Sequence, residues 1–227
     1  MSKDLTNEYF IEKYKNDNVI IAKPYVVDNI DIEGIVNPLK IDNRQLCSPT
    51  DQQGSTPHCA GFSGAQYIES LYWKETGTPI QIEASQIYAK AKLIDGMKDV
   101  DGTTPTAVLH AAIGLCGWED KGYKVDIYFK ESKEKTIEYI KYLIHKNMFI
   151  LIGFNICEGW YKVTNEKYKI NHSGETLGGH CVLGCGYNKE GFYIQNSWGK
   201  DWGAKGFALI PWNVFMKEFM YCAWLTK

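Results

Sequence analysis

Three residues that can together perform nucleophilic catalysis lie far apart in the chain. Cys59 begins a predicted amphipathic helix over 59–75, where unpaired backbone N–H groups and the helix dipole stabilise a thiolate. His180 lies in a predicted strand, and Asn196 directly follows another. A histidine can take the thiol proton, and a side-chain amide can hold the imidazole through its other ring nitrogen. Because a single cysteine at a helix start is more often a buried small residue, this chemistry requires all three to meet.

Each of the three residues lies in a short motif, and the motifs carry a resemblance. They are Gln53-Gly54-Ser55-Thr56-Pro57-His58-Cys59-Ala60-Gly61-Phe62-Ser63, Gly178-Gly179-His180-Cys181-Val182-Leu183 and Gln195-Asn196-Ser197-Trp198-Gly199-Lys200-Asp201-Trp202-Gly203. In these motifs and their order the chain resembles the papain-like cysteine peptidases over about residues 37–227. The run Ile41-Asp42-Asn43-Arg44 before the first motif is similar to the bacterial branch of that family.

The resemblance implies a catalytic role for four residues. Cys59 would be the nucleophile, His180 the base that takes its proton, and Asn196 the residue that orients the imidazole. Gln53 would donate to the developing oxyanion beside the backbone N–H of Cys59, a donor typically worth about 3 kcal/mol. Trp198 would shield the contact between His180 and Asn196 from water.

The resemblance also implies where substrate binds. In the family a glycine pair lines the groove and pairs with an extended peptide; the matching positions are Gly102 and Thr103. Gly179, just before the histidine, should offer its carbonyl to the substrate backbone. With Trp198, these residues are the predicted substrate-binding set.

The first motif departs from the family pattern. Thr56 stands where the family usually has a disulfide-bonded cysteine, Pro57 and His58 replace a frequent Gly-Ser pair, and Ala60 replaces an aromatic residue. These changes leave the wall beside Cys59 more open, and they make His58 an alternative proton acceptor. They also leave open a second hypothesis, a catalytically weak papain-like module that binds peptides without cleaving them, although the intact catalytic residues argue against it.

The resemblance implies a thiol-dependent endopeptidase that hydrolyses peptide bonds through a Cys59 acyl-enzyme. A transpeptidase would use the same intermediate, and an exopeptidase the same triad, but no added segment long enough to close the groove is evident. We expect polypeptide substrates, protein inhibitors as further partners, a monomer and no cofactor. We expect no metal, because His180 and Cys181 are neighbours on a strand and point to opposite faces.

Hydrophobic periodicity predicts helices first and strands later, the pattern of an α+β protein with two lobes. Helices are expected over 59–75, 81–94, 105–115 and 136–146, and strands over 148–156, 179–187, 191–195 and 206–210. The papain-like fold would then have a helical lobe over about 45–130 and a β-barrel-like lobe over about 131–227, with the active site in the cleft between them.

Residues 1–36 form a predicted N-terminal extension ahead of this domain. Leu5 to Tyr14 is helix-like, and Val19 to Val27 is β-rich. We interpret the extension as a short prosegment whose strand docks on the body or in the groove, making the chain a zymogen. Its removal should then raise activity.

Composition excludes several other classes. The 227 residues are 44% hydrophobic and 23% charged with a net charge of −2, which argues against a disordered chain and a nucleic-acid binder. The longest apolar run, Met148 to Phe154, is too short for the roughly 18 residues of a membrane span. With no signal segment visible, a cytoplasmic location and reduced cysteines are expected, although a sequence trimmed at its N-terminus or another secretion route stays open.

Overall fold

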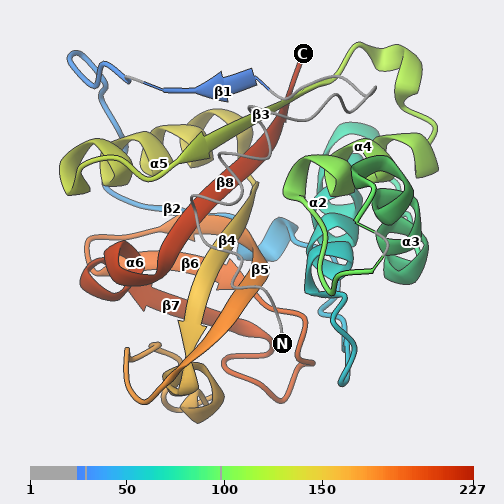
Figure 1. The fold of residues 1–227 in the computed structure, drawn as a ribbon. Helices are drawn as coiled ribbons and strands as arrows, with labels where there is room; N and C mark the ends of the chain where they lie inside the picture. The colour runs from blue at the N-terminus through green and yellow to red at the C-terminus, as the bar shows by residue number, and fades with distance from the viewer. Residues whose placement is uncertain (1–24, 29, 98) are drawn as a thin grey trace.

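The computed structural model describes residues 25–28, 30–97 and 99–227. The elements within them comprise one large sheet, three helices grouped beside it and two further helices packed on it (Figure 1). The helices are α2 (Cys59–Thr76), α3 (Ala84–Asp95), α4 (Pro105–Leu115), α5 (Lys133–Asn147) and α6 (Trp212–Glu218), with short 3-10 turns η1 (Arg44–Leu46), η2 (Glu119–Lys121) and η3 (Glu158–Lys162). None of the described helices is long and apolar enough to cross a membrane.

The strands join into one mixed sheet of eight. They are β1 (Tyr25–Val27), β2 (Ile41–Asp42), β3 (Lys124–Phe129), β4 (Ile150–Cys157), β5 (Thr176–Tyr187), β6 (Gly191–Gln195), β7 (Phe207–Pro211) and β8 (Phe219–Thr226). Their order is β1-β3-β8-β4-β5-β6-β7, with β2 paired to β5. The pairs are antiparallel except for β1 beside β3.

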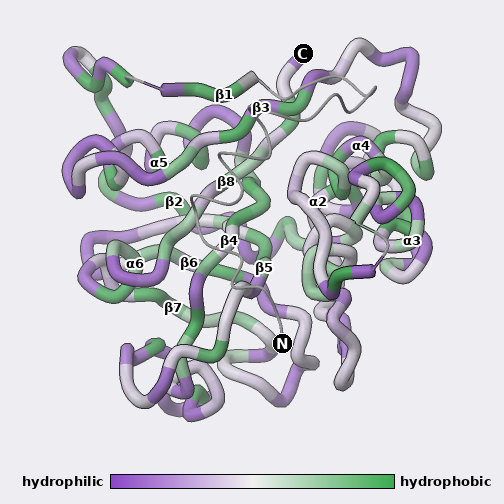
Figure 2. Tube along the Cα trace, in the orientation of Figure 1, coloured by the Kyte–Doolittle hydropathy of each residue, from purple (hydrophilic) through white to green (hydrophobic). Residues whose placement is uncertain are grey.

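Side chains alternate between two hydrophobic cores on the two faces of this sheet. Leu151 and Cys181 belong to the core shared with α2, α3 and α4, whereas their neighbours Ile152 and Val182 belong to the core under α5 and α6. Such alternation is expected of strands, in which successive side chains point to opposite faces of the sheet. Figure 2 shows hydrophobic residues along β8, both hydrophilic and hydrophobic residues on α5, and hydrophilic residues on outer loops.

Local chemistry sets the limits of the site-bearing helices. Helix α2 ends at Gly77, which adopts a left-handed conformation with φ of 70° and donates its N–H to Trp73. Helix α4 begins with the Thr104 hydroxyl accepting from the Ala107 N–H and with Pro105 in its first turn. At Gly64 a Cβ would lie 2.3 Å from Val108 Cγ1, so glycine allows α2 and α4 to approach closely.

The α+β papain-like class is confirmed, but one detail of the prediction is wrong. The β-rich lobe is not barrel-like: among the described residues the sheet is open, running from β1 at one end to β7 at the other. Strand β3 at 124–129, which precedes the predicted start of this lobe at about 131, pairs with β8, and the lobe bounds stay a prediction. The C-terminal segment forms the strand β8 between β3 and β4.

The predicted N-terminal segments fall partly outside the described residues. The helix-like stretch from Leu5 to Tyr14 and most of the β-rich run lie there. Tyr25–Val27 is described and pairs in parallel with residues 126–128 of β3. The Asn37 side chain donates to the backbone carbonyl of Glu138 on α5 at 3.0 Å, which ties the start of the domain to the body.

A buried carboxyl group inside α2 gives a pH-dependent stability. Burial raises the pKa of Glu69 to about 7, although its Oε1 accepts from the Ile82 N–H at 2.8 Å. A carboxyl whose folded pKa is raised stabilises the fold at low pH, and that contribution is lost as pH rises from about 4.5 through 7. We expect Glu69→Gln, which keeps the acceptor without the charge, to raise the free energy of unfolding by about 2 kcal/mol at pH 8. Urea unfolding of both proteins at pH 5 and pH 8 checks this; an equal difference at both pH values would contradict it.

Candidate active site

Helix α2 and strand β5 bring the predicted nucleophile and base together. Cys59 is the first residue of α2, and His180 lies within β5. The buried Ser63 hydroxyl donates to the Cys181 carbonyl at 2.7 Å, and the Gln66 amide donates to the Asn196 carbonyl at 3.3 Å. These two bonds join the helical group to the sheet directly behind the site.

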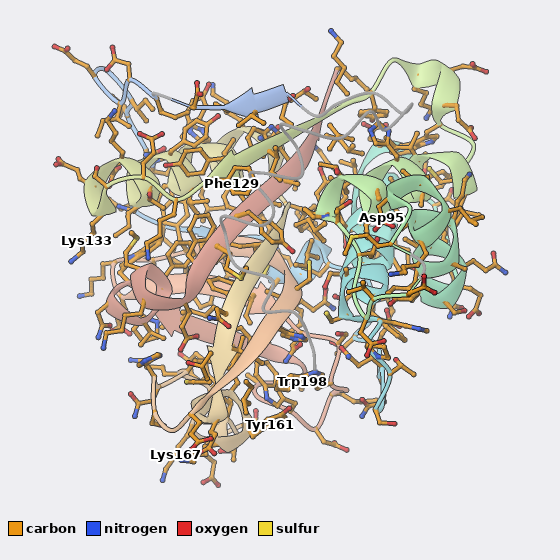
Figure 3. The ribbon with its side chains drawn as sticks, viewed as in Figure 1. Asp95, Phe129, Lys133, Tyr161, Lys167 and Trp198 are labelled. Carbon is orange, nitrogen blue, oxygen red and sulfur yellow. The ribbon has the colours of Figure 1, made fainter. Side chains whose placement is uncertain are left out.

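A cavity of about 570 Å³ contains most of the predicted site residues. Its lining includes Gln53, Cys59, Gly102, Gly179, His180 and Trp198. Tyr161 also lines this cavity, and its ring stacks on that of Trp198 with centroids 4.9 Å apart. Figure 3 shows these two residues at the lower end of the β-rich lobe and Asp95 in the helical lobe. The tertiary structure therefore unites residues from three distant motifs in one cleft.

The imidazole of His180 is held by Asn196. Its Nε2 lies 2.8 Å from Asn196 Oδ1, which also accepts from the Ser197 N–H at 2.8 Å. The Trp198 ring lies 4.8 Å from the imidazole, centroid to centroid, and Trp160 meets it edge-on at 5.8 Å. With Nε2 bound to the amide oxygen, Nδ1 is the ring nitrogen left to exchange a proton in the cleft.

Burial acts against charge on both reacting groups. It raises the pKa of the Cys59 thiol, and hydrogen bonds from backbone N–H groups, including that of Cys181, oppose this only in part. Burial likewise lowers the pKa of His180 to about 4, against the contact with Asn196. The predicted lowering of the thiol pKa at the helix start is therefore reversed, because desolvation outweighs the helix terminus. Burial therefore favours a neutral Cys59 thiol and a neutral His180 imidazole.

Gln53 lies at the cleft, but one of its amide hydrogens already has a partner. Its Nε2 donates to the Thr56 carbonyl at 2.9 Å, and its Oε1 accepts from the Ser197 hydroxyl at 2.6 Å. The Gln53 backbone N–H donates to the Ser197 carbonyl at 2.8 Å. Because an amide nitrogen carries two hydrogens, this fixed side chain retains a second donor.

The two predicted groove residues differ in their contacts. The Gly102 N–H donates to the Tyr88 hydroxyl at 3.1 Å, and the Gly102 carbonyl accepts from Lys92 Nζ at 2.8 Å. Thr103 is buried, and its hydroxyl donates to Asp95 at 2.5 Å. The backbone of Gly102 is thus already engaged within the protein.

A smaller cavity of about 50 Å³ adjoins the cleft and was missed by sequence reasoning. It shares Cys59 and His180 with the larger cavity and is otherwise lined by residues that include Ala60, Gly153, Met220 and Tyr221. A Cβ on Gly153 would lie 2.3 Å from Tyr221 Cζ, so that glycine makes room for the phenol ring. A glycine inside an apolar strand was the one available signal of such a close approach.

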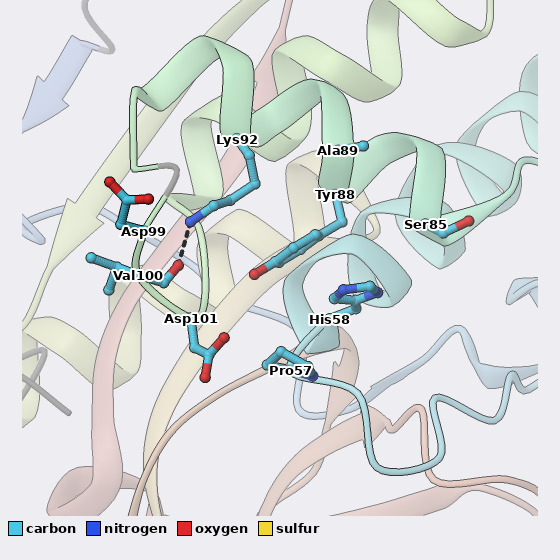
Figure 4. Close-up of a pocket in the computed structure, with 9 residues that line it drawn as sticks. All are labelled: Pro57, His58, Ser85, Tyr88, Ala89, Lys92, Asp99, Val100 and Asp101. Atoms are coloured by element: carbon cyan, nitrogen blue, oxygen red, sulfur yellow. Dashed lines mark hydrogen bonds between the residues drawn. The ribbon is translucent and has the colours of Figure 1, made fainter. Parts of the chain in front are cut away.

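His58 contacts another aromatic residue. Its ring stacks on Tyr88 of α3 with centroids 3.9 Å apart and an interplanar angle of 27°. Both residues line an open pocket of about 620 Å³ on the helical side of the cleft, where Lys92 bonds to the Val100 carbonyl (Figure 4). This stacking packs the His58 ring against α3.

Comparison with known sequences identifies relatives of the same kind. The model of the papain family cysteine protease matches residues 110–220, which include His180 and Asn196. Cysteine proteinase 3 of Solanum lycopersicum is 23% identical over 220 residues, covering 86% of this chain and 62% of its own length. The gut-specific cysteine proteinase of Caenorhabditis elegans is 31% identical over 161 residues, covering 66% of this chain and 47% of its own. The chain therefore spans less than two thirds of the curated relatives it matches.

Solved structures share the fold. Xylellain, a cysteine protease from Xylella fastidiosa, superposes with a TM-score of 0.64 at 18% identity, covering 90% of this chain and 95% of its own. The Carica candamarcensis cysteine protease CMS1MS2 in complex with E-64 gives a TM-score of 0.59 at 18% identity, covering 84% of this chain and 99% of its own. The matching family model, these relatives and the shared architecture support the identification of the chain as a papain-like cysteine peptidase.

Proposed function

We propose that the chain is a thiol-dependent endopeptidase that hydrolyses peptide bonds through a Cys59 acyl-enzyme. The observation that carries this proposal is a single cleft lined by Cys59 and His180, in which Asn196 binds His180 Nε2 at 2.8 Å. His180 Nδ1 takes the thiol proton as the sulfur attacks the carbonyl carbon, and the resulting imidazolium protonates the departing amine. Water, deprotonated by the same nitrogen, then attacks the thioester and releases the free acid and Cys59.

Charge on the carbonyl oxygen develops next to two donors. These are the second Nε2–H of Gln53 and the backbone N–H of Cys59, the first residue of α2. The bond from the Ser197 hydroxyl to Gln53 Oε1 holds the amide in place before substrate arrives. A donor that is already positioned needs no reorganisation in the transition state, which is the basis of oxyanion stabilisation.

The substrate is best described as an extended polypeptide crossing the cleft. Gly102 and Thr103 on one wall and Gly179 on the other are the proposed partners of the peptide backbone; Gly102 and Gly179 line the cleft, and Thr103 lines the small cavity beside it. Cleavage within a chain is proposed over removal of terminal residues, because the sequence shows no added segment long enough to close the groove. If an amine instead of water attacked the acyl-enzyme, the enzyme would act as a transpeptidase.

We propose that the small cavity beside Cys59 and His180 receives a substrate side chain near the scissile bond and selects a small one. Tyr221 projects against Gly153 and leaves only about 50 Å³ there. We expect Tyr221→Ala to raise the ratio of kcat/KM for Leu over Ala at that substrate position at least about tenfold, because a few methylenes account for such ratios. Peptide pairs that differ at this one residue measure the ratio. Tyr221→Phe, which keeps the ring, should leave it unchanged, and an equal shift in both variants would contradict the explanation.

Residues 1–36 are proposed as an N-terminal extension that restrains the domain formed by 37–227. The described strand at Tyr25–Val27 pairs with β3, so this part can stabilise the sheet, and the proposed restraint rests on the sequence of 1–36. Two shortened chains, starting at Tyr25 and at Asn37, separate the roles. Faster peptide hydrolysis by the first supports restraint, and unchanged hydrolysis counts against it. Lower stability of the second alone supports a structural strand.

We further propose that the protein acts as a cytoplasmic monomer, with protein inhibitors of the cleft as additional partners. All seven cysteines are free thiols, which suits a reducing compartment. Sedimentation measures the monomer directly, and a stable dimer at micromolar concentration would contradict it.

The enzyme proposal is tested by intact-mass analysis after incubation with a peptidyl epoxide under reducing conditions. We expect one adduct per chain, lost in Cys59→Ala and kept in Cys116→Ala, which removes another half-buried thiol. Peptide turnover by the same three proteins must follow the same pattern. Absence of both labelling and turnover would favour the peptide-binding module, and a product joined to an added amine would show transpeptidation.

A further inference from the structure

A second group of reactive side chains lies outside the cleft, where β4, the following loop and α6 meet. It consists of Cys157 at the end of β4, His172 before β5 and Glu218 at the end of α6. One ligand atom from each lies within 4.8 Å of the other two. Cys157 Sγ is 3.3 Å from Glu218 Oε1, and His172 Nδ1 is 2.6 Å from that oxygen. None of the three lines the cleft or the cavity beside it.

The three donor types suit zinc. A thiolate sulfur, an imidazole nitrogen and a carboxylate oxygen bind Zn²⁺ at about 2.0–2.3 Å, so that tetrahedral ligands stand about 3.3–3.6 Å apart. The sulfur–oxygen distance of 3.3 Å already matches this spacing. The nitrogen–oxygen distance of 2.6 Å is that of a proton-mediated contact and must lengthen by less than 1 Å. His172 can make this adjustment, because its side chain is 36% exposed.

The surroundings orient two of the ligands before any ion binds. The indole N–H of the buried Trp160 donates to Glu218 Oε2 at 2.7 Å, which leaves Oε1 directed at the cluster. The Ser173 N–H donates to Cys157 Sγ at 3.3 Å, a contact that stabilises a thiolate. Hydrogen bonds of this kind to metal ligands typically change metal affinity 10–100-fold.

The backbone around the cluster is closely packed. The Gly159 N–H donates to the Ser173 carbonyl at 2.9 Å, and the Glu158 N–H donates to the Glu175 carbonyl at 3.1 Å. A Cβ on Gly159 would lie 1.7 Å from the Asn171 carbonyl oxygen, so this position accepts only glycine. The loop that carries His172 is therefore fixed against the segment that follows Cys157.

Charge balance also favours a cation here. Glu218 is 1% exposed and Cys157 is fully buried, so an ionised carboxylate at this place requires a positive partner. In the structure that partner is His172, which forms an ion pair when protonated. A divalent cation would replace the proton between His172 and Glu218, and the Cys157 thiolate and the Glu218 carboxylate would neutralise its charge. The fourth coordination position would be open to water on the side of the exposed His172.

We propose that Cys157, His172 and Glu218 form a zinc site with three protein ligands and a water molecule. The site would join the end of β4, the 171–175 loop and α6 around Trp160, whose ring meets His180 edge-on. Its role would be structural support beneath the active site. This inference is independent of the proposed peptidase activity.

The test is a Zn²⁺ and Co²⁺ titration of the full chain after dialysis against a chelator, in a Cys59→Ala background that removes the cleft thiol. We expect one ion per chain by elemental analysis, and a sulfur-to-cobalt charge-transfer band in the Co²⁺ form. Zn²⁺ should also raise the melting temperature, because it binds the folded state. Each readout is independent of activity.

Two ligand variants and a control make the result decisive. We expect His172→Ala, at an exposed position where folding should be retained, to weaken Zn²⁺ binding at least tenfold, and Cys157→Ser to remove the cobalt charge-transfer band. His145→Ala, on α5, should change neither. Absence of binding by the parent protein, or binding that persists unchanged in His172→Ala, would overturn the proposal and leave a proton-mediated ion pair.

Discussion

Replacement of Cys59 by alanine should lower kcat/KM for a peptide substrate by at least about 10⁴-fold, because no acyl-enzyme can form without the sulfur. His180→Ala should cost nearly as much, and the double variant little more than either, since the two residues act as one unit. Cys116→Ala should retain full activity. Single-turnover and steady-state assays on the four variants, corrected for folding by circular dichroism, provide the comparison.

Two outcomes would contradict this assignment. Activity of Cys59→Ala within tenfold of the parent would move the nucleophile elsewhere. Costs of Cys59→Ala and His180→Ala that simply multiply in the double variant would show that the two residues work independently, against the common cleft they line.

The largest effect on stability is expected from Phe154→Ala. Phe154 is fully buried on β4, opposite His180 of β5, and its ring contacts Trp160, Phe215 and Phe219 at centroid distances of 5.7, 5.4 and 6.3 Å. Removing a buried phenylalanine ring costs about 3–5 kcal/mol from lost burial and the cavity left behind. That is a large share of the 5–15 kcal/mol that typically separates folded from unfolded domains.

Urea unfolding measures this loss as a lower midpoint at unchanged slope. Leu39→Ala is the matched control: the Leu39 side chain is 94% exposed, and its removal should change the free energy of unfolding by less than about 0.5 kcal/mol. A loss below 1 kcal/mol in Phe154→Ala would mean that the aromatic cluster closes over the gap and that the packing described around Trp160 is not tight.

The helical elements could be predicted closely because local signals mark them. Pro105 and Gly77 stand at a helix start and just past a helix end, where the structure places them. The strands β3 and β8 were missed. In β3 the sequence did carry a strand signal, because Val125 and Ile127 alternate with more exposed residues. In β8 the signal is ambiguous, because the strand is a nearly continuous apolar run. Such a run is buried on both faces between β3 and β4, and its periodicity does not distinguish strand from helix.

The open sheet is likewise a matter of long-range pairing. A set of short strands predicts a β-rich lobe, but whether its ends meet depends on which strands become neighbours. Here β8, the last strand, inserts between β3 and β4, and β1 extends the sheet beyond β3. These pairings join residues that lie between 65 positions apart (Phe154 and Phe219) and 102 positions apart (Lys124 and Thr226), which local patterns do not specify.

By itself the sequence determined the chemical groups available at the active site and the elements that carry them: a thiol at a helix start, an imidazole in a strand and an amide after the next strand. Only the tertiary structure decided their protonation, because burial between α2 and β5 raises the thiol pKa and lowers that of His180. It also decided that Tyr221 fills the space above Gly153 and that Cys157 meets Glu218, 61 residues away. Desolvation and contact depend on neighbours brought by folding, whereas motif and periodicity are properties of adjacent residues.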